Sequence, residues 1–275
     1  MVREAVKMEK IRLLGSGGQA KIFLVKIRGK LYACKESHNT KILERESRFL
    51  QMVDHERFVR FGEYLEEDKK GILVMEYIPG CNLGRLMCGQ GLERKKTMEV
   101  LIEAAEGIAY LHSMKRPVLH RDIKPENIMI TPEGSVKLID LGCACFEGAG
   151  EMDAAGTKGY APAEQVNREG KPGTYSDVYA FGRMMHFLLT GDNPYLPPFK
   201  KPDIRHYDRF WGKDLAELTE ACVKEEPENR PPDMRYVLHE LEKIAARRKK
   251  WDLFMQRGKG ICHSEFVYEK NILIK

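Results

Sequence analysis

The sequence predicts an α+β fold with two unequal lobes: a small, mainly β lobe with one helix, followed by a larger, mainly helical lobe. From Ile11 to about Tyr77, short segments rich in Ile, Leu, Val and Phe alternate with glycine-containing turns, which is typical of strands. After Pro79-Gly80 the apolar residues recur at steps of three and four, which is typical of helices. The joint between the lobes is predicted near Tyr77–Asn82, and a cleft at such a joint commonly binds a ligand.

In the small lobe, Arg28-Gly29-Lys30 predicts a hairpin turn between a strand at Lys21–Ile27 and a strand at Leu31–Lys35. The apolar residues of the next segment recur at helical steps, so one helix is predicted at about Thr40–Val53. The small lobe is therefore predicted to consist of strands interrupted by a single helix.

In the large lobe, two long apolar helices are predicted, at Thr97–Met114 and at Val178–Leu189, the second ended by Thr190-Gly191. Between them, Ile128–Ile130 and Val136–Ile139 flank a turn that contains Pro and Gly, which predicts a short β-hairpin. This hairpin is the one strand pair expected inside the helical lobe.

The composition fits one cytoplasmic domain. The chain has 275 residues with 46 basic against 41 acidic side chains, a mild net charge of +5 that does not indicate a nucleic-acid binder. No apolar run approaches the about 20 residues that cross a bilayer, and Met1–Lys10 has no apolar signal core. Seven cysteines without a regular framework indicate free thiols in a reducing compartment.

We expect a single domain at residues 1–250, with the small lobe at about 8–78 and the large lobe at about 82–250. Residues 251–275 form a tail with an apolar end, Ile272-Leu273-Ile274. We expect this tail to dock on the domain or on a second copy of the chain, which would make a homodimer.

A lysine and a glutamate of the small lobe are predicted to form an ion pair. Glu46 falls on the apolar stripe of the predicted helix, and a buried carboxylate without a cation costs several kcal/mol. Lys35, at the end of the preceding strand, is the natural partner, and the pair would fix its ammonium for contact with phosphate. Gly15 and Gly17 let backbone amides approach an anion closely, although taken alone they indicate a plain hairpin turn.

The segment from His120 to Asn127 and the Asp140-Leu141-Gly142 motif lie on either side of the predicted hairpin. Asn127 enters its first strand and Asp140 leaves its second, so the two side chains should be neighbours and offer hard oxygen ligands for Mg²⁺. Asp122 lies five residues before Asn127, where it can orient an incoming hydroxyl and accept its proton. Lys124 adds positive charge near the transferred group, and phosphoryl transfer requires little else.

In this order the motifs resemble the signature of the protein kinase superfamily: a Gly-rich loop, a strand lysine, a helix glutamate, a His-Arg-Asp loop and a metal-binding Asp-Leu-Gly. The resemblance runs from about Ile11 to Ile244. It is particularly to the serine/threonine kinases of bacteria, at Gly156–Tyr160 and Glu164-Gln165. It implies the two-lobed protein-kinase fold, ATP as the donor, Mg²⁺ or alternatively Mn²⁺ as the metal, and protein substrates with Ser or Thr acceptors.

The resemblance also implies a role for each matched residue. Asp122 would be the catalytic base, Lys124 would stabilise the γ-phosphoryl group, and Thr157 would bridge these two. Glu46 would hold Lys35 against the α- and β-phosphates. The remaining ligand contacts would be Asn127 and Asp140 for the metal, and Gly15, Gly17, Ile22, Ala33, Lys35, Met75, Glu76, Ile78, Met129 and Ile139 for the nucleotide. Asp177 would brace the catalytic loop, and Glu164 would form a buried ion pair with Arg230.

Three departures from the family pattern keep other functions open. Ala20 replaces the third glycine of the loop, Pro162 and Ala163 have exchanged places, and only eleven residues separate Lys35 from Glu46. A pseudokinase that binds nucleotide or partners without catalysis is one alternative, against which Lys35, Asp122, Asn127 and Asp140 are all present. A small-molecule kinase of the aminoglycoside or choline type is the other, against which stand Thr157, Glu164, Asp177 and Arg230.

The segment between Leu141 and Gly156 contains no Ser, Thr or Tyr. In relatives, the arginine before the catalytic aspartate, Arg121 here, often pairs with a phosphorylated residue of this segment. We hypothesise that an acidic residue takes that place, so that activity requires no phosphorylation there; the candidates are Glu147, Glu151 and Asp153. A segment that is simply flexible is the equal alternative.

Overall fold

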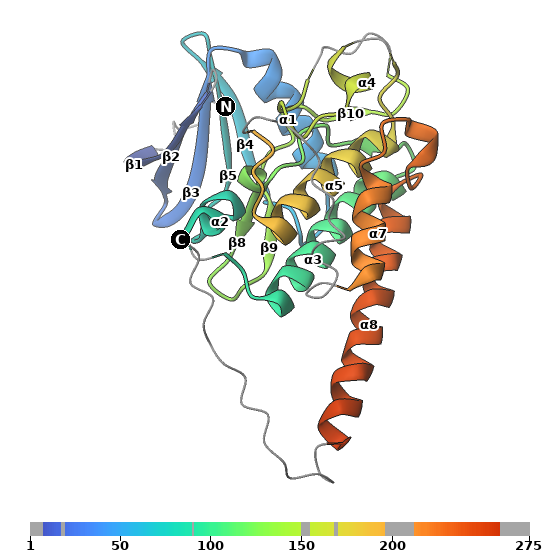
Figure 1. Cartoon of the computed structure of the whole chain (residues 1–275). Helices are drawn as coiled ribbons and strands as arrows, with labels where there is room; N and C mark the ends of the chain where they lie inside the picture. Colours follow the sequence, from blue (N-terminus) through green and yellow to red (C-terminus); the bar gives the residue numbers. More distant parts are fainter. Residues whose placement is uncertain are drawn as a thin grey trace.

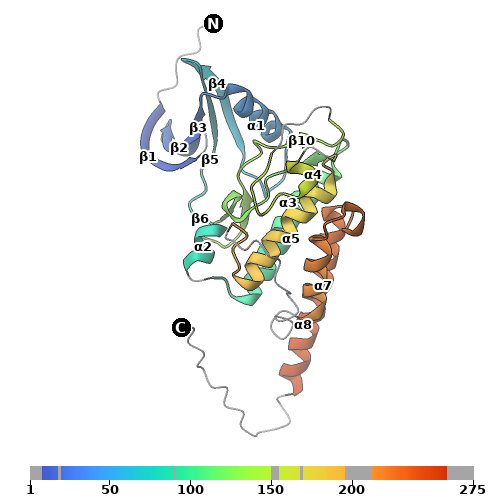
Figure 2. The ribbon, with the colours of Figure 1, turned by 45° about the horizontal axis from the view of Figure 1, so that its top comes forward.

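The computed structural model describes residues 8–17, 20–89, 91–149, 155–167, 170–195 and 212–258, with side chains as far as Lys249. It confirms the predicted α+β fold, because a five-stranded antiparallel sheet is followed by a mainly helical lobe (Figure 1). The sheet and helix α1 lie at one end of the molecule, and the long helices lie at the other (Figure 2).

The sheet of the small lobe has the strand order β1-β2-β3-β5-β4. The strands are β1 Met8–Gly17, β2 Ala20–Ile27, β3 Lys30–Ser37, β4 Phe61–Glu67 and β5 Lys70–Glu76. The predicted turn between β2 and β3 is confirmed: Arg28 and Gly29 have φ values of 49° and 83°, the left-handed pair typical of a tight hairpin.

Strand β3 lies in the middle of this sheet and positions two of the predicted site residues. Its residue Lys35 pairs with Ile22 on β2 and with Leu73 on β5, while Ala33 pairs with Met75 on β5. Because side chains two apart on a strand share a face, Ala33 and Lys35 lie on the same face of the sheet.

Helix α1, Thr40–Met52, is the single helix predicted for the small lobe. Only two residues, His38 and Asn39, connect it to β3. Asn39 caps the helix by accepting a hydrogen bond from the Ile42 backbone N–H at 3.3 Å, and Ser37 Oγ accepts one from the Asn39 N–H at 3.0 Å. The short connection is therefore ordered by its own side chains.

The large lobe contains α2 Leu83–Gly89, α3 Arg94–Ser113, α4 Ala163–Val166, α5 Thr174–Thr190, α7 Lys213–Cys222 and α8 Met234–Gly258. Helices α3 and α5 begin three and four residues before the predicted starts, Thr97 and Val178. Their first turns carry polar side chains, which show no apolar periodicity, so the sequence pattern missed them. Most of the buried apolar residues of α3 and α5 belong to one core that continues into the small lobe as far as Leu73.

The short strands of the large lobe are β6 Cys81–Asn82, β7 Val118–Leu119, β8 Ile128–Ile130, β9 Val136–Leu138 and β10 Cys145–Phe146. Strands β8 and β9 form the predicted hairpin, with Ile128 opposite Leu138, and β7 pairs with β10. Asn127 is the last residue of a 3₁₀ turn, Pro125–Asn127, directly before β8, and its carbonyl accepts a hydrogen bond from the Ile139 N–H at 3.1 Å. The hairpin thus brings Asn127 beside Ile139, the residue before Asp140.

Within the described residues, no helix has the length and apolar character needed to span a membrane. The backbone of α8 continues through the first eight residues of the predicted tail and, in Figure 2, extends beyond the other helices of the large lobe. Residues 259–275 lie outside the described residues, so the docking of the tail stays a prediction.

Candidate active site

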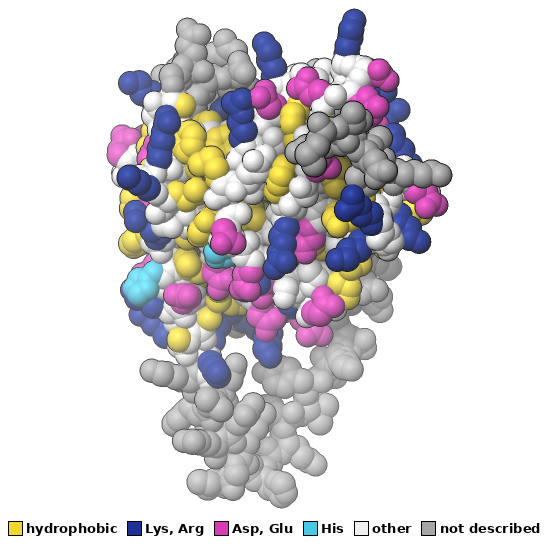
Figure 3. Space-filling model, turned by 180° about the vertical axis from the view of Figure 1, so that it is seen from behind, with side chains coloured by type: hydrophobic (Ala, Val, Ile, Leu, Met, Phe, Trp, Pro, Cys, Tyr) yellow, Lys and Arg dark blue, Asp and Glu magenta, His cyan; other side chains and the backbone are white. Residues whose placement is uncertain are grey.

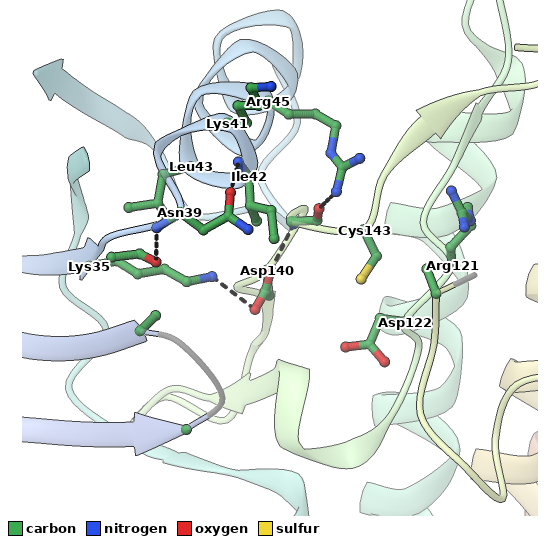
Figure 4. A pocket seen from close by; sticks show the side chains of 15 residues that line it. Lys35, Asn39, Lys41, Ile42, Leu43, Arg45, Arg121, Asp122, Asp140 and Cys143 are labelled. Carbon is green, nitrogen blue, oxygen red and sulfur yellow. Dashed lines mark hydrogen bonds and ion pairs between the residues drawn. The ribbon is translucent and has the colours of Figure 1, made fainter. Parts of the chain in front are cut away.

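A cavity of about 550 Å³ lies between the two lobes (Figure 4). Its lining joins β1, β3 and α1 of the small lobe to the segments around Asp122 and Asp140 of the large lobe. The lining residues are Gly17, Ala20, Lys35, Ser37, Asn39, Lys41, Ile42, Leu43, Arg45, Arg121, Asp122, Asp140, Gly142, Cys143 and Ala155. The cavity therefore includes four of the predicted site residues from distant parts of the chain.

Lys35 binds two carboxylates at this cavity. Its Nζ lies 2.8 Å from Glu46 Oε2 and 3.0 Å from Asp140 Oδ2. Glu46 is fully buried on α1, whereas the side chain of Asp140 is 32% exposed. The predicted pair of Lys35 and Glu46 is thus present despite the short spacing, and it extends across the cleft to the large lobe.

One ammonium cannot neutralise two carboxylates, and the pKa values reflect this. Burial raises the pKa of Glu46 to about 7, with Asp140 adding to the rise and Lys35 opposing it. Burial would also raise the pKa of Asp140, but Lys35 and the Gly142 N–H hold it below its usual value. Burial alone would lower the pKa of Lys35, and the two carboxylates more than offset this and raise it. The group formed by Lys35, Glu46 and Asp140 would therefore be stabilised by an additional positive charge.

Asp122 lies at the centre of a second group of polar contacts. Its Oδ1 accepts a hydrogen bond from Thr157 Oγ1 at 2.6 Å, and its Oδ2 lies 2.8 Å from Lys124 Nζ. Lys124 Nζ also donates to Thr157 Oγ1 at 2.7 Å. Asn127 Nδ2 donates to both the backbone oxygen and Oδ2 of Asp122, at 2.8 and 3.0 Å. The structure thus places Thr157 between Asp122 and Lys124.

The segment at His120–Arg121, which leads to Asp122, is held in place by α5. Asp177 is fully buried and accepts hydrogen bonds from the backbone N–H groups of His120 and Arg121, at 2.7 and 2.8 Å. His112 accepts from the Met234 N–H through Nδ1, so its Nε2 carries the proton and donates to Asp177 Oδ2 at 3.0 Å. Although burial would raise it, these hydrogen bonds hold the pKa of Asp177 below its usual value.

The residues predicted to bind a metal have the donor chemistry for Mg²⁺. Asn127 uses its amide nitrogen for both contacts with Asp122, which leaves its Oδ1 to accept from elsewhere. Asp140 is partly exposed at the cavity and belongs to a cluster with excess negative charge. Two protein oxygens suit Mg²⁺, which usually takes its other ligands from water and substrate phosphates. Among the described residues, no group of three or more His, Cys, Asp or Glu side chains is placed to hold a metal ion.

The remaining predicted nucleotide contacts come from both lobes. In the small lobe, the end of β1 carries Gly15 and Gly17, β2 carries Ile22, and β3 carries Ala33. The end of β5 carries Met75 and Glu76, and Ile78 follows two residues later. In the large lobe, β8 carries Met129, and Ile139 directly follows β9. None of them except Gly17 lines the cavity, which covers only the side of the cleft around Lys35 and Asp140. Their contact with adenine stays a prediction.

The exchange of Pro162 and Ala163 leaves the neighbouring ion pair intact. Pro162 precedes the first residue of α4, and Glu164 accepts from Arg230 at 2.6 and 3.2 Å and from Ser176 Oγ at 2.9 Å. Arg230 also donates to the carbonyl oxygens of Lys224 and Glu225, so this buried pair is extensively hydrogen-bonded.

The predicted partner of Arg121 is not decided. Glu147 accepts a hydrogen bond from the Thr174 N–H at 3.1 Å, and the Arg121 side chain is hydrogen-bonded to Cys145. Glu151 and Asp153 lie outside the described residues. The hypothesis that an acidic residue replaces a phosphate therefore stays a prediction.

Sequence reasoning missed several residues of the cavity, of which Arg45 makes the most direct contact. Its Nη2 donates to the Gly142 carbonyl oxygen at 2.6 Å. Lys41 of α1 and Asn39, which caps this helix, also line the cavity, and Cys143 lines it from the large lobe (Figure 4). The sequence carries no signal for this contact, because the partner of Arg45 is a backbone carbonyl and neighbouring residues of a helix point in different directions.

Away from the cleft, the surface seen from behind carries interspersed basic and acidic side chains (Figure 3). This view agrees with the near balance of 46 basic and 41 acidic residues.

Comparison with known proteins agrees with this geometry. The family model described as "Protein kinase domain" matches residues 8–241, most of the chain. The chain belongs to the protein kinase family.

Individual relatives share about three residues in ten with the chain. Human receptor-interacting serine/threonine-protein kinase 3 is 30% identical over 255 residues, covering 82% of this chain and 49% of the relative. A putative mitogen-activated protein kinase kinase kinase 7-like protein of Drosophila melanogaster is 29% identical over 245 residues, covering 81% and 62%. Chitin elicitor receptor kinase 1 of Arabidopsis thaliana is 28% identical over 281 residues, covering 87% and 45%. The chain spans about half the length of these relatives.

Proposed function

We propose that this chain transfers the γ-phosphoryl group of ATP to serine or threonine hydroxyls of proteins, with Mg²⁺ or Mn²⁺ as the metal. The observation that carries the proposal is the arrangement of Lys35, Asp122 and Asp140 around one cavity. A phosphate-binding cation, a metal-binding carboxylate and a base for the acceptor hydroxyl are the groups that this reaction needs.

On this proposal Asp122 accepts the proton of the acceptor hydroxyl. Its Oδ1 and Oδ2 are held by Thr157, Lys124 and Asn127, so the carboxylate has a fixed orientation before substrate binds. Lys124 lies next to the reacting hydroxyl and stabilises the negative charge on the transferred phosphoryl group.

Lys35 binds the α- and β-phosphates, and Glu46 together with Asp140 holds its ammonium in place. Asn127 and Asp140 would hold Mg²⁺, which supplies positive charge to the phosphates. The two carboxylates around Lys35 outnumber its single ammonium, which favours binding of a divalent cation beside Asp140 together with the nucleotide.

Two observations support a serine/threonine acceptor on a protein. Several relatives are named serine/threonine-protein kinases, among them human receptor-interacting serine/threonine-protein kinase 3 and a probable serine/threonine-protein kinase of Arabidopsis thaliana. In addition, Thr157 contacts both Asp122 and Lys124, the bridge that the family resemblance associates with this specificity. Glu164, Arg230 and Asp177, which the family resemblance associates with a protein substrate, make the contacts expected of them: Glu164 pairs with Arg230, and Asp177 accepts from the His120 N–H.

The test is incubation with Mg²⁺, radiolabelled ATP and a generic protein substrate, comparing the wild type with Asp122→Asn. Asp68→Asn is the matched control, because Asp68 is exposed in the β4–β5 turn and does not line the cavity. We expect transfer to Ser or Thr by the wild type and by the control, and a loss of about 10³-fold or more in Asp122→Asn.

The same assay separates the alternatives. Equal and negligible transfer by all three proteins, with ATP still bound, would indicate a pseudokinase. Label that appears on an aminoglycoside or choline but on no protein would indicate a small-molecule kinase.

A further inference from the structure

Arg45 reaches from α1 of the small lobe to the turn that follows Asp140 in the large lobe. Its Nη2 donates to the Gly142 carbonyl oxygen at 2.6 Å, as Figure 4 shows. The neighbouring residue, Glu46, binds Lys35, which in turn binds Asp140. Two successive residues of α1 therefore contact the Asp140 segment, Arg45 directly and Glu46 through Lys35.

Gly142 connects Arg45 to Asp140. Its N–H donates to Asp140 Oδ1 at 2.8 Å, while its carbonyl accepts from Arg45. A glycine imposes little preference on its own backbone angles. A Cβ at this position would lie 3.0 Å from Asp140 Oδ1, so any residue other than glycine would require a small shift of the Asp140 side chain or of the backbone. The N–H and the carbonyl of Gly142 belong to successive peptide groups that meet at its Cα, so the bond from Arg45 to the carbonyl restricts the backbone angles that relate the two groups.

The placement of Arg45 is itself determined by the start of α1. Asn39 caps the helix, and Ser37 fixes Asn39, so the two-residue connection holds α1 against the end of β3. Arg45 is half-buried, and its Nε has no partner among the described residues. Burying the Nε–H without a partner costs free energy, and the hydrogen bond from Nη2 of the same side chain to the Gly142 carbonyl offsets part of that cost.

We propose that Arg45 is a positioning residue for the metal ligand Asp140, acting through Gly142. This inference rests on the proposed function, in which Asp140 binds the Mg²⁺ that accompanies the nucleotide. Lys35 fixes Oδ2 of Asp140, and the contact from Arg45 through Gly142 fixes Oδ1, so the carboxylate is oriented before the metal arrives. Loss of Arg45 weakens the binding of metal more than the binding of nucleotide.

The first test measures the affinity of a fluorescent ATP analogue as a function of Mg²⁺ concentration. Arg45→Met keeps the aliphatic stem and removes the donor, and Arg45→Lys keeps the charge. Arg48→Met is the matched control, because Arg48 is exposed on the same helix and pairs with Glu44 at 2.5 Å. We expect the half-saturating Mg²⁺ concentration to rise about tenfold in Arg45→Met and about threefold in Arg45→Lys, a tenfold rise being about 1.4 kcal/mol. Arg48→Met should match the wild type.

A merely structural role would give a different result. If Arg45→Met lowers the affinity for nucleotide equally with and without Mg²⁺, or leaves the half-saturating Mg²⁺ concentration unchanged, the proposal is wrong. If Arg45→Met does not fold, Arg45→Lys decides: an unchanged Mg²⁺ requirement in that variant contradicts the proposal.

Hydrogen exchange of the nucleotide-free protein separates this inference from the proposed function. We expect the Gly142 amide to exchange at least about tenfold faster in Arg45→Met than in Arg48→Met, since its bond to Asp140 becomes less persistent. Equal exchange in both variants would contradict the role of Arg45. A wild type whose binding of nucleotide does not depend on Mg²⁺ would instead contradict the proposed function, and the exchange experiment would still decide on Arg45.

Discussion

Two buried ion pairs among the described residues, Glu164–Arg230 and Lys35–Glu46, differ in how completely their charges are satisfied. Arg230 donates to both oxygens of Glu164 and to the carbonyls of Lys224 and Glu225. Lys35, by contrast, is shared between Glu46 and Asp140, and burial raises the pKa of Glu46 to about 7. A pair with a complete set of partners stabilises the fold, whereas a cluster that lacks positive charge is suited to bind a cation.

The largest effect on stability is expected at the satisfied pair. Arg230→Met leaves the carboxylate of Glu164 buried without a cation and removes the side-chain donor from two carbonyl oxygens, so the free energy of unfolding should fall by about 3–5 kcal/mol. Urea denaturation measures this. The control is Arg235→Met, because Arg235 is largely exposed and its pair with Asp233 should contribute at most about 1 kcal/mol. Similar losses in both variants would remove the distinction between the two kinds of pair.

Lys35→Met should cost less stability, about 1–3 kcal/mol, because Glu46 can take up a proton once its cation is lost. The loss should be smaller at pH 6, where Glu46 is already largely protonated, than at pH 8. Binding of nucleotide should fall at both pH values. Denaturation at the two pH values tests this, and a loss that does not depend on pH would show that Glu46 is not the responsible group.

Glu46→Gln should change how stability depends on pH. The pKa of Glu46 is about 7 in the folded state, above the value of about 4.5 for an unperturbed Glu. Its contribution to stability is therefore fully present below pH 4.5 and is lost as the pH rises through 7. Relative to Glu46→Gln, the wild type should lose about 1–3 kcal/mol between pH 5 and pH 8, and parallel stability curves over this range would contradict the expectation.

The smallest effect is expected from Ser176→Ala. The Ser176 hydroxyl is buried, donates to Glu164 Oε1 at 2.9 Å and accepts from the Gly173 N–H at 3.2 Å. Its removal should lower the free energy of unfolding by about 1–2 kcal/mol and leave nucleotide binding unchanged. A change in nucleotide affinity, measured by titration calorimetry, would show that the two ion pairs are coupled.

The sequence allowed much of the fold to be predicted because the two lobes have different apolar periods. The turn at Arg28-Gly29 and the β8–β9 hairpin follow from local turn chemistry, and the helix at Thr40 follows from its apolar stripe. The starts of α3 and α5 could not be located, since polar first turns are fixed by tertiary packing and not by periodicity.

For the site, the pairing of Lys35 with Glu46 could be predicted from burial, because a carboxylate on an apolar face requires a cation. The link from Lys35 to Asp140 could not, since the distance between residues 105 positions apart depends on how the lobes close. The same limit applies to Arg45, whose partner is a backbone carbonyl and therefore has no sequence signature.

The two-residue connection between β3 and α1 has a mechanical consequence. Two residues span at most about 7 Å, so α1 cannot rotate away from the cleft without pulling on the end of the strand that carries Lys35. We therefore expect the first turn of α1 to follow any movement of the end of β3, and with it the position of Lys35.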